Sequence, residues 1–98
     1  MSSTLLSAQT IEQGVLTAWP EATGEIIIPQ SVTKIGNKAF QGNRNITAVT
    51  FSNGLEEIGD EAFMNCSKLT ELTFPNSLQR IGFKAFYKCG GLTTIQFG

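Results

Sequence analysis

A nonapeptide that returns at a fixed interval constrains the fold of this chain more than any other feature. It occurs three times, as IGNKAFQGN, IGDEAFMNC and IGFKAFYKC at residues 35–43, 58–66 and 81–89. Successive copies start 23 residues apart. A fixed period of about 20–50 residues is typical of arrays in which similar units stack on one another. The sequence therefore predicts a stack of coils.

The repeat extends well beyond the nonapeptide. Its units cover residues 25–47, 48–70 and 71–93, and a fourth unit begins at 94–98. Six apolar columns run through the units, and they contain Ile26, Val49, Leu72; Ile28, Phe51, Phe74; Val32, Leu55, Leu78; Ile35, Ile58, Ile81; Phe40, Phe63, Phe86; and Ile46, Leu69, Leu92. Burying one such side chain contributes about 1.5–3 kcal/mol, whereas ordering each residue of a unit costs about 1.5 kcal/mol. Because a lone unit cannot offset this cost, we expect a solenoid in which each coil covers the next.

Two further columns carry charges that alternate in sign along the stack. They contain Lys34, Glu57 and Arg80 in one column and Lys38, Glu61 and Lys84 in the other. Coils about 4.8 Å apart place opposite charges side by side. Each exposed pair contributes about 0–1 kcal/mol, which is enough to help fix the register. We therefore interpret the carboxylates of Asp60 and Glu61 as register charges, although they lie close to Cys66 in the sequence.

The two cysteines share one repeat column with an asparagine. Cys66 and Cys89 are aligned with Asn43, which predicts a small, half-buried group that hydrogen-bonds to loop backbone. The sulfurs should lie one coil apart, within the Cα range of a disulfide, although parallel side chains hold the Cβ atoms slightly too far apart. We expect free thiols, with a disulfide as the alternative. Two thiols without histidine do not complete a zinc site.

The segment that follows each conserved Ile-Gly pair is expected to turn sharply. Gly36, Gly59 and Gly82 occupy one column, where a bend or a positive φ would explain the absence of a side chain. The residues after each glycine suit a helical turn, with alanine and phenylalanine directed into the core. We therefore predict short parallel strands joined by short helical turns.

Composition excludes several classes of function. A net charge of −1 and a pI near 5.3, without any Lys/Arg run, argue against a nucleic-acid partner. No apolar stretch approaches the roughly 20 residues that cross a bilayer, so we expect no membrane insertion, and no signal peptide is evident. The chain has no histidine, which removes the commonest general base and nitrogen ligand. We expect no enzymatic activity, no cofactor and no metal site.

Three segments of the chain carry a common consensus. They read LTELTFPNSLQRIGFKAFYKC, ITAVTFSNGLEEIGDEAFMNC and, more loosely, EIIIPQSVTKIGNKAFQGN. This pattern resembles the BspA-type, or Treponema pallidum-type, leucine-rich repeat over residues 14–98, with Ser52 in place of a proline and Asn43 in place of a cysteine. The resemblance implies a right-handed leucine-rich-repeat solenoid of the α/β class, without catalytic residues in the repeat itself.

The family resemblance also implies a location and a role. Bacterial arrays of this type are similar to surface or secreted proteins that attach to host extracellular-matrix proteins or to other cells. We therefore expect a non-catalytic protein-binding module of an adhesin-like protein at the cell surface or secreted. A structural spacer without its own ligand is the competing interpretation, and a thiol-based redox or metal protein is a third.

The strand pattern predicts where a binding surface would lie. The segments ITAVTF, LTELTF and LTTIQF alternate apolar and polar residues with the period of a strand. Their outward rows contain Glu25, Ala48, Glu71, Thr94 and Ile27, Thr50, Thr73, Gln96. Because solenoids bind partners on such surfaces, the protein-binding candidates on this face are Ile27, Thr50, Glu71, Thr73, Thr94 and Gln96. A threonine-rich ladder equally suits strands that merely face water.

An aromatic pair in the third unit is a second candidate surface. Phe83 and Tyr87 are spaced i to i+4 where the second unit has Asp60 and Met64. Contact with a protein partner and packing on a neighbouring coil are both consistent with this spacing.

The two ends of the array differ. Residues 1–24 do not fit the repeat, and Ile11–Glu12 with Val15–Trp19 predict a β-hairpin that caps the core. Leu5, Leu6 and Trp19 are available to cover it, and we interpret Trp19 as a lid residue rather than a ligand platform. After Phe97 no cap follows, so we expect a segment of a longer protein or self-association through this edge.

Overall fold

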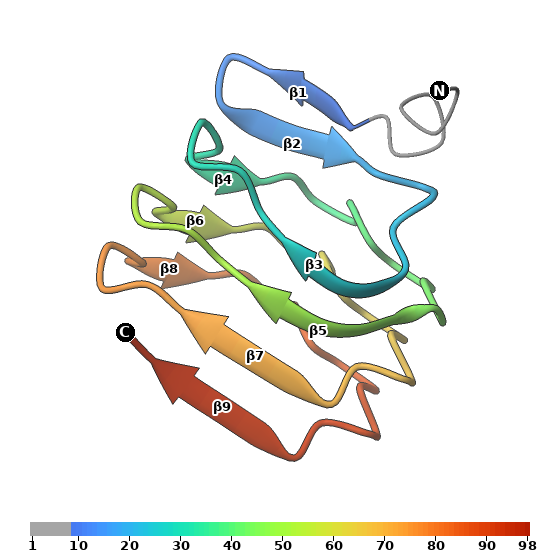
Figure 1. Ribbon diagram of the computed structural model, residues 1–98. Coiled ribbons are helices and arrows are strands. Elements are labelled where there is room, and N and C mark those ends of the chain that lie inside the picture. The colour runs from blue at the N-terminus through green and yellow to red at the C-terminus, as the bar shows by residue number, and fades with distance from the viewer. Residues whose placement is uncertain (1–8) are drawn as a thin grey trace, which may run out of the picture.

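The chain winds as a β-solenoid with one sheet on each of two sides. The computed structural model describes residues 9–98, in which nine strands form two sheets and no helix occurs. The five-stranded sheet contains β1 (Thr10–Glu12), β2 (Val15–Ala18), β4 (Lys34–Ile35), β6 (Glu57–Ile58) and β8 (Arg80–Ile81). The four-stranded sheet contains β3 (Gly24–Ile27), β5 (Ile46–Thr50), β7 (Glu71–Phe74) and β9 (Thr94–Phe97). Figure 1 shows the two sheets as the back and front of the stack.

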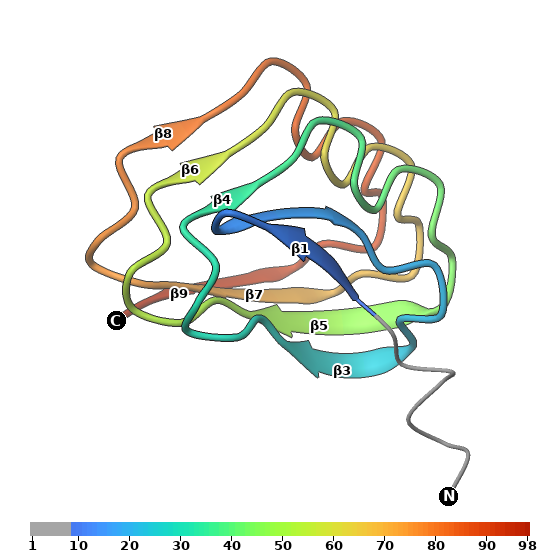
Figure 2. The same ribbon diagram turned by 90° about the horizontal axis from the view of Figure 1, so that it is seen from above.

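The register of both sheets confirms the predicted period. In the five-stranded sheet Ile35 pairs with Ile58, and Ile58 pairs with Ile81, in parallel strands. In the four-stranded sheet Val49 pairs with Leu72 in the same way. Seen from above the stack, the coils follow similar paths, and each is displaced from the one before it (Figure 2). Each repeat column is therefore one row of the structure.

The core consists of these rows, and one of them is a column of stacked phenylalanine rings. The rings of Phe40 and Phe63 stack with centroids 4.8 Å apart, and those of Phe63 and Phe86 stack at 5.2 Å. A second stack joins Phe51 and Phe74 at 5.5 Å, and the edge of Phe51 meets Phe63 at 5.8 Å. The two stacks thus link the four-stranded sheet to the opposite side of the coils.

The expected helical turns are wrong. Residues 36–43, 59–66 and 82–89 instead form irregular segments that we call the turn ribbons, in which consecutive turns replace a helix. Each contains two residues with positive φ, namely Lys38 and Gly42, Glu61 and Asn65, and Lys84 and Lys88. Non-glycine residues enter this region at a cost of about 1–3 kcal/mol, and an α-helix does not contain them.

Backbone hydrogen bonds explain why the ribbons prefer this conformation. In the first ribbon, Ala39 N–H donates to the Gly36 carbonyl within the coil, whereas Phe40 N–H donates to the Ala62 carbonyl of the next coil at 2.7 Å. The alternation continues, since Gly42 N–H donates to the next coil as well. In a helix, the N–H groups would donate to carbonyls of the same coil. The ribbons instead use alternate N–H groups to hold successive coils together.

The conserved glycines are needed for close approach between coils, and the positive φ expected for them is not found. Gly36, Gly59 and Gly82 are absent from the positive-φ residues. A Cβ at Gly59 would lie 2.8 Å from the backbone nitrogen of Asn37, and one at Gly82 would lie 2.7 Å from that of Asp60. Gly59 and Gly82 are therefore glycine because any side chain would collide with the preceding coil, whereas a Cβ at Gly36 would make a tight contact of 3.2 Å with the Leu16 carbonyl oxygen.

The charge columns are confirmed in the first row and in part in the second. Glu57 Oε2 lies 3.6 Å from Lys34 Nζ and 2.9 Å from Arg80 Nη2. The hydrogen bond from Arg80 is the main cause that lowers the pKa of Glu57. In the second row Lys38 Nζ lies 3.8 Å from Glu61 Oε1. The register function of Asp60 is direct, because its Oδ1 accepts the Phe83 N–H at 2.8 Å.

The hairpin near the N-terminus is present, but a separate cap is not supported. Strands β1 and β2 are antiparallel, as expected. However, Val15 and Leu16 of β2 pair in parallel with Lys34 and Ile35, so β2 continues the solenoid sheet. Trp19 packs on Phe40 with ring centroids 6.2 Å apart, at the edge of the core. The proposed cover residues Leu5 and Leu6 lie outside the described residues.

Candidate functional site

The outer face of the four-stranded sheet carries six of the eight predicted binding residues. Strand alternation buries Val49 and Leu72 in the core and turns their neighbours to the outside. The parallel register then places the outward residues of β3, β5, β7 and β9 in two continuous rows. These rows bring together Ile27, Thr50, Glu71, Thr73, Thr94 and Gln96, as the sequence predicted.

A shallow hollow lies on this face. Its volume is ≈ 320 Å³, and its outward-facing lining consists of Glu25, Ile27, Ala48, Thr50, Glu71 and Thr73. Ile27 is 67% exposed, which is unusual for an isoleucine within a strand. Glu25 and Ala48 belong to the same outward rows, although they were not among the selected candidates. Their positions in the repeat are the signal that identifies Glu25 and Ala48 as residues of this face.

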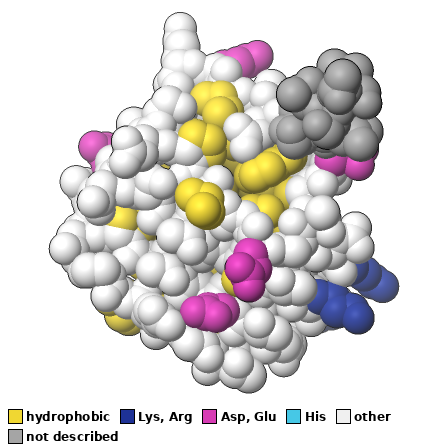
Figure 3. All heavy atoms as spheres, viewed as in Figure 1, with side chains coloured by type: hydrophobic (Ala, Val, Ile, Leu, Met, Phe, Trp, Pro, Cys, Tyr) yellow, Lys and Arg dark blue, Asp and Glu magenta, His cyan; other side chains and the backbone are white. Residues whose placement is uncertain are grey.

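The chemical character of the face is apolar and acidic. Glu71 Oε2 accepts a hydrogen bond from Gln96 Nε2 at 3.1 Å, so two predicted residues hold one another in place. Figure 3 shows hydrophobic and acidic side chains on this side of the molecule, whereas lysine and arginine side chains gather at its margin. The hollow contains hydroxyl, carboxylate and methyl groups but no nucleophile paired with a base. This arrangement suits binding by hydrogen bonds and apolar contact.

Phe83 and Tyr87 form a separate surface. Both lie on the third turn ribbon, and they are 68% and 44% exposed. Lys84 Nζ lies between them, 5.2 Å from the Phe83 ring centroid and 4.7 Å from that of Tyr87. The pair therefore packs around a cation of its own ribbon, in the geometry of a cation–π contact. The structure does not join this pair to the sheet face.

The cysteine column has the predicted structural geometry. Cys66 Sγ donates to the Phe40 carbonyl at 3.1 Å, and Cys89 Sγ donates to the Phe63 carbonyl at 3.1 Å. Asn43 makes the corresponding contact through Nδ2, which donates to the Ala22 carbonyl at 3.0 Å. Both cysteines are free. Burial raises the pKa of Cys66 to about 12, so this thiol is not activated as a nucleophile.

The stacked coils, their parallel sheets and the recurring apolar rows define a leucine-rich-repeat solenoid. Residues 9–98 match the model of the BspA type Leucine rich repeat region (6 copies). The chain therefore belongs to the BspA-type leucine-rich repeat family. The match includes β1 and β2, so it begins before the first regular unit at residue 25.

The chain is also similar to solved structures. A leucine rich cell surface protein from Faecalibacterium prausnitzii A2-165 is similar over 86% of this chain and 35% of its own chain, with 18% identity and a TM-score of 0.42. This chain thus spans only about a third of the length of that protein. No curated protein matches the chain. In residues 9–98 there is no helix that is long and apolar enough to cross a membrane.

Proposed function

We propose that this chain is a non-catalytic protein-binding module of a cell-surface or secreted, adhesin-like protein. The observation that supports this proposal is the hollow on the outer face of the four-stranded sheet, where an exposed isoleucine adjoins carboxylates and hydroxyls. A protein surface is the partner class that such a mixture fits, because protein interfaces combine an apolar centre with a polar surround. Membership of the BspA-type family supports the assignment to the bacterial cell surface.

Rigidity of the sheet supports a binding role. The parallel ladders fix the backbone beneath Ile27, Thr50 and Thr73, and the Gln96 hydrogen bond restrains the carboxylate of Glu71. A partner therefore meets groups that are already ordered, which reduces the entropy that binding would otherwise cost.

Substitutions on this face test the proposal. Glu71→Gln, Thr73→Ala and Gln96→Ala should each weaken binding to at least one protein in a panel of immobilised extracellular-matrix proteins, measured by surface plasmon resonance. The matched control is Gln79→Ala, because Gln79 is exposed beside β8, away from this face. Melting curves should stay the same for all four variants. If the face variants bind as tightly as the control, the sheet face is not the binding surface.

The alternative is a structural spacer, and the regularity of the coils favours it. In that case the unsubstituted chain binds no protein of the panel, and the outward threonines serve only as strand formers. A third outcome is that binding persists in every variant of the face but is lost in Phe83→Ala and Tyr87→Ala. That result would indicate that the module contacts its partner through the third turn ribbon.

We also propose that the end formed by β8 and β9 self-associates. Ile81, Ile95 and Phe97 are 47%, 48% and 78% exposed, whereas their row partners Ile58, Leu72 and Phe74 are 0%, 0% and 4% exposed. Sedimentation equilibrium should show reversible association that Phe97→Glu abolishes. A monomer at all concentrations would contradict this proposal and leave the sheet-face proposal untouched.

A further inference from the structure

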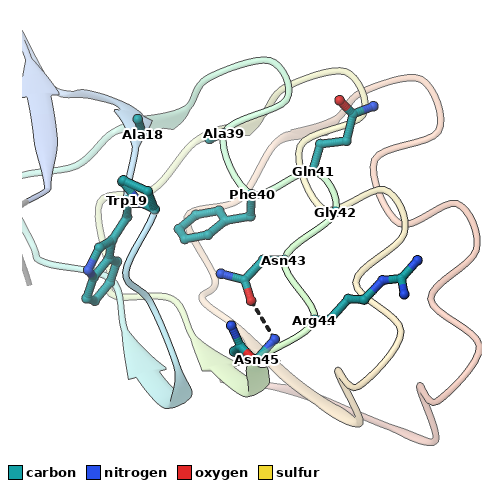
Figure 4. A pocket seen from close by; sticks show the side chains of 10 residues that line it. Ala18, Trp19, Ala39, Phe40, Gln41, Gly42, Asn43, Arg44 and Asn45 are labelled. Carbon is teal, nitrogen blue, oxygen red and sulfur yellow. Dashed lines mark hydrogen bonds between the residues drawn. The ribbon is translucent and has the colours of Figure 1, made fainter.

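A second hollow lies at the other end of the stack, beside Trp19. Eight residues lie between Leu16 and Glu25, whereas twelve lie between their strand partners Ile35 and Ala48. The first winding is therefore four residues shorter than the coils that follow and contains no turn ribbon. The space that a ribbon would fill is a hollow of ≈ 460 Å³ between Trp19 and the first turn ribbon (Figure 4).

The first turn ribbon, beside this hollow, has backbone acceptors without donors, and two of them belong to the lining residues Ala39 and Gln41. At the junction between the first and second ribbons, Lys38, Phe40 and Gly42 donate their N–H groups to the next ribbon at 3.0, 2.7 and 2.8 Å. Their acceptors are the carbonyls of Asp60, Ala62 and Met64. Carbonyls at these positions thus face the preceding coil, and the equivalents in the first ribbon are those of Asn37, Ala39 and Gln41. No described residue donates to these three carbonyls.

The lining of the hollow carries charge of one sign, although Glu21 follows Pro20 of the lining directly. Arg44 lines it, and no aspartate or glutamate does. Lys38, in the same ribbon, is paired on one side only, with Glu61 of the next coil. A carboxylate on the open side would extend the alternation of charges that the array uses between its own coils. Within the described part of the chain, the buried Nε1 of Trp19 also lacks a hydrogen-bond partner, so this end is incompletely satisfied.

We propose that the hollow beside Trp19 binds an acidic segment of a partner protein, which adopts the conformation of the missing turn ribbon and takes its place. The segment offers N–H groups at alternate residues to the carbonyls of Asn37, Ala39 and Gln41, and its carboxylates lie beside Lys38 and Arg44. Backbone pairing of this kind is related to strand addition, except that the acceptor is a turn ribbon and not the edge of a sheet. The site is distinct from the outer face of the four-stranded sheet. A second copy of this chain is a poor occupant, because the free ribbon at its far end carries two lysines, Lys84 and Lys88.

The chain's own second ribbon supplies a probe of the right chemistry. The synthetic peptide GDEAFMNSS, acetylated and amidated, copies residues 59–67 with serine in place of Cys66. Trp19 is the only tryptophan of the chain, and the peptide has none, so the emission of Trp19 reports directly on the hollow. Titration of the complete chain with this peptide should produce a saturable change in emission. No change up to millimolar peptide would overturn the proposal.

Two control peptides separate charge from backbone pairing. GNQAFMNSS, in which the carboxylates are replaced by amides, should bind about three- to tenfold more weakly. A peptide with N-methyl groups at the residues equivalent to Glu61, Phe63 and Asn65 should not bind, since it lacks the donors. Binding of either control as tightly as the acidic peptide would refute the corresponding half of the proposal.

Protein variants complete the test. The double substitution Lys38→Gln and Arg44→Gln should erase the preference for the acidic peptide. Replacing residues 17–24 by a copy of residues 59–70 restores the missing ribbon, and this variant should no longer bind a fluorescently labelled peptide in an anisotropy titration. Undiminished binding by the variant would place the peptide elsewhere. If the emission of Trp19 instead changes with protein concentration alone, a second copy occupies the hollow and the acidic-segment proposal fails.

Discussion

The turn ribbons and the outer face of the four-stranded sheet repeat with the same period but obey different constraints. In the ribbons, glycine, alanine and phenylalanine recur in every coil because the next coil lies in direct contact. On the sheet face, one outward row changes from Glu25 to Ala48 to Glu71, since only solvent adjoins it. The comparison teaches that contact between coils fixes the residues of the ribbons, whereas the face is free to vary for recognition.

The largest expected effect follows from opening the phenylalanine column. Phe63→Ala removes a fully buried ring that stacks on Phe40 and Phe86. Large-to-small changes of this kind cost about 3–5 kcal/mol. We expect a loss of that size in the free energy of unfolding by urea denaturation, and a smaller loss for Phe86→Ala, because Phe86 is only partly buried. Equal losses would show that burial does not distinguish the two coils.

The next effect tests the close approach of the ribbons. Gly59→Ala places a Cβ against the backbone of the preceding coil, and overpacking of this kind costs about 1–3 kcal/mol. Gly90→Ala is the matched control, since a Cβ there meets no atom within 4 Å. Thermal melting should show a clear decrease for the first variant and almost none for the second. A Gly59→Ala protein as stable as the control would refute the steric explanation of this column.

A smaller effect concerns the pH dependence of the first charge row. The pKa of Glu57 is lowered below its ordinary value of 4.5, chiefly by the hydrogen bond from Arg80. A carboxylate with a depressed folded-state pKa stabilises the fold above its unfolded value, and this contribution disappears as pH falls through the folded value. The free energy of unfolding should therefore differ less between pH 7 and pH values below 4 in Glu57→Gln than in the unsubstituted protein. Because the pair is exposed, the same difference should shrink on addition of 1 M salt.

The smallest effect is expected on the sheet face. Thr50→Ala changes an exposed side chain, and surface substitutions usually alter stability by less than about 0.5 kcal/mol. Val49→Ala, one residue away in β5, changes a buried side chain and should cost several times more. Urea denaturation of both variants measures the contrast. A large loss for Thr50→Ala would mean that the face is structural and would weaken its assignment as a binding surface.

The sequence predicted the rows of the fold because each row is a column of the repeat. The strand register, the phenylalanine stack and the hydrogen-bonding position of Cys66 all follow from the 23-residue period. For the same reason it predicted six residues of the sheet face. These features depend only on which residues lie one coil apart, and a single repeated sequence contains that information.

The features that the sequence did not predict depend on backbone geometry. The helical turns were wrong because Lys38, Glu61 and Lys84 adopt positive φ, which residues other than glycine rarely do and which their side chains do not signal. The reason for Gly59 was also missed, since close approach of two coils is visible only once they are stacked. The hollow beside Trp19 arises from a length difference between windings, and the strand partners had to be known before it could be seen.

The alternate bonds of the turn ribbons give the array a direction. Every amide that leaves the first and second ribbons points toward the following coil, and every carbonyl that receives one belongs to that coil. One end of the stack is thus a row of hydrogen donors and the other a row of acceptors, so the two ends are chemically unlike and cannot substitute for each other. Any polypeptide that lengthens the ribbons must therefore present donors to the acceptor end or acceptors to the donor end, in the same orientation as the coils of the chain itself.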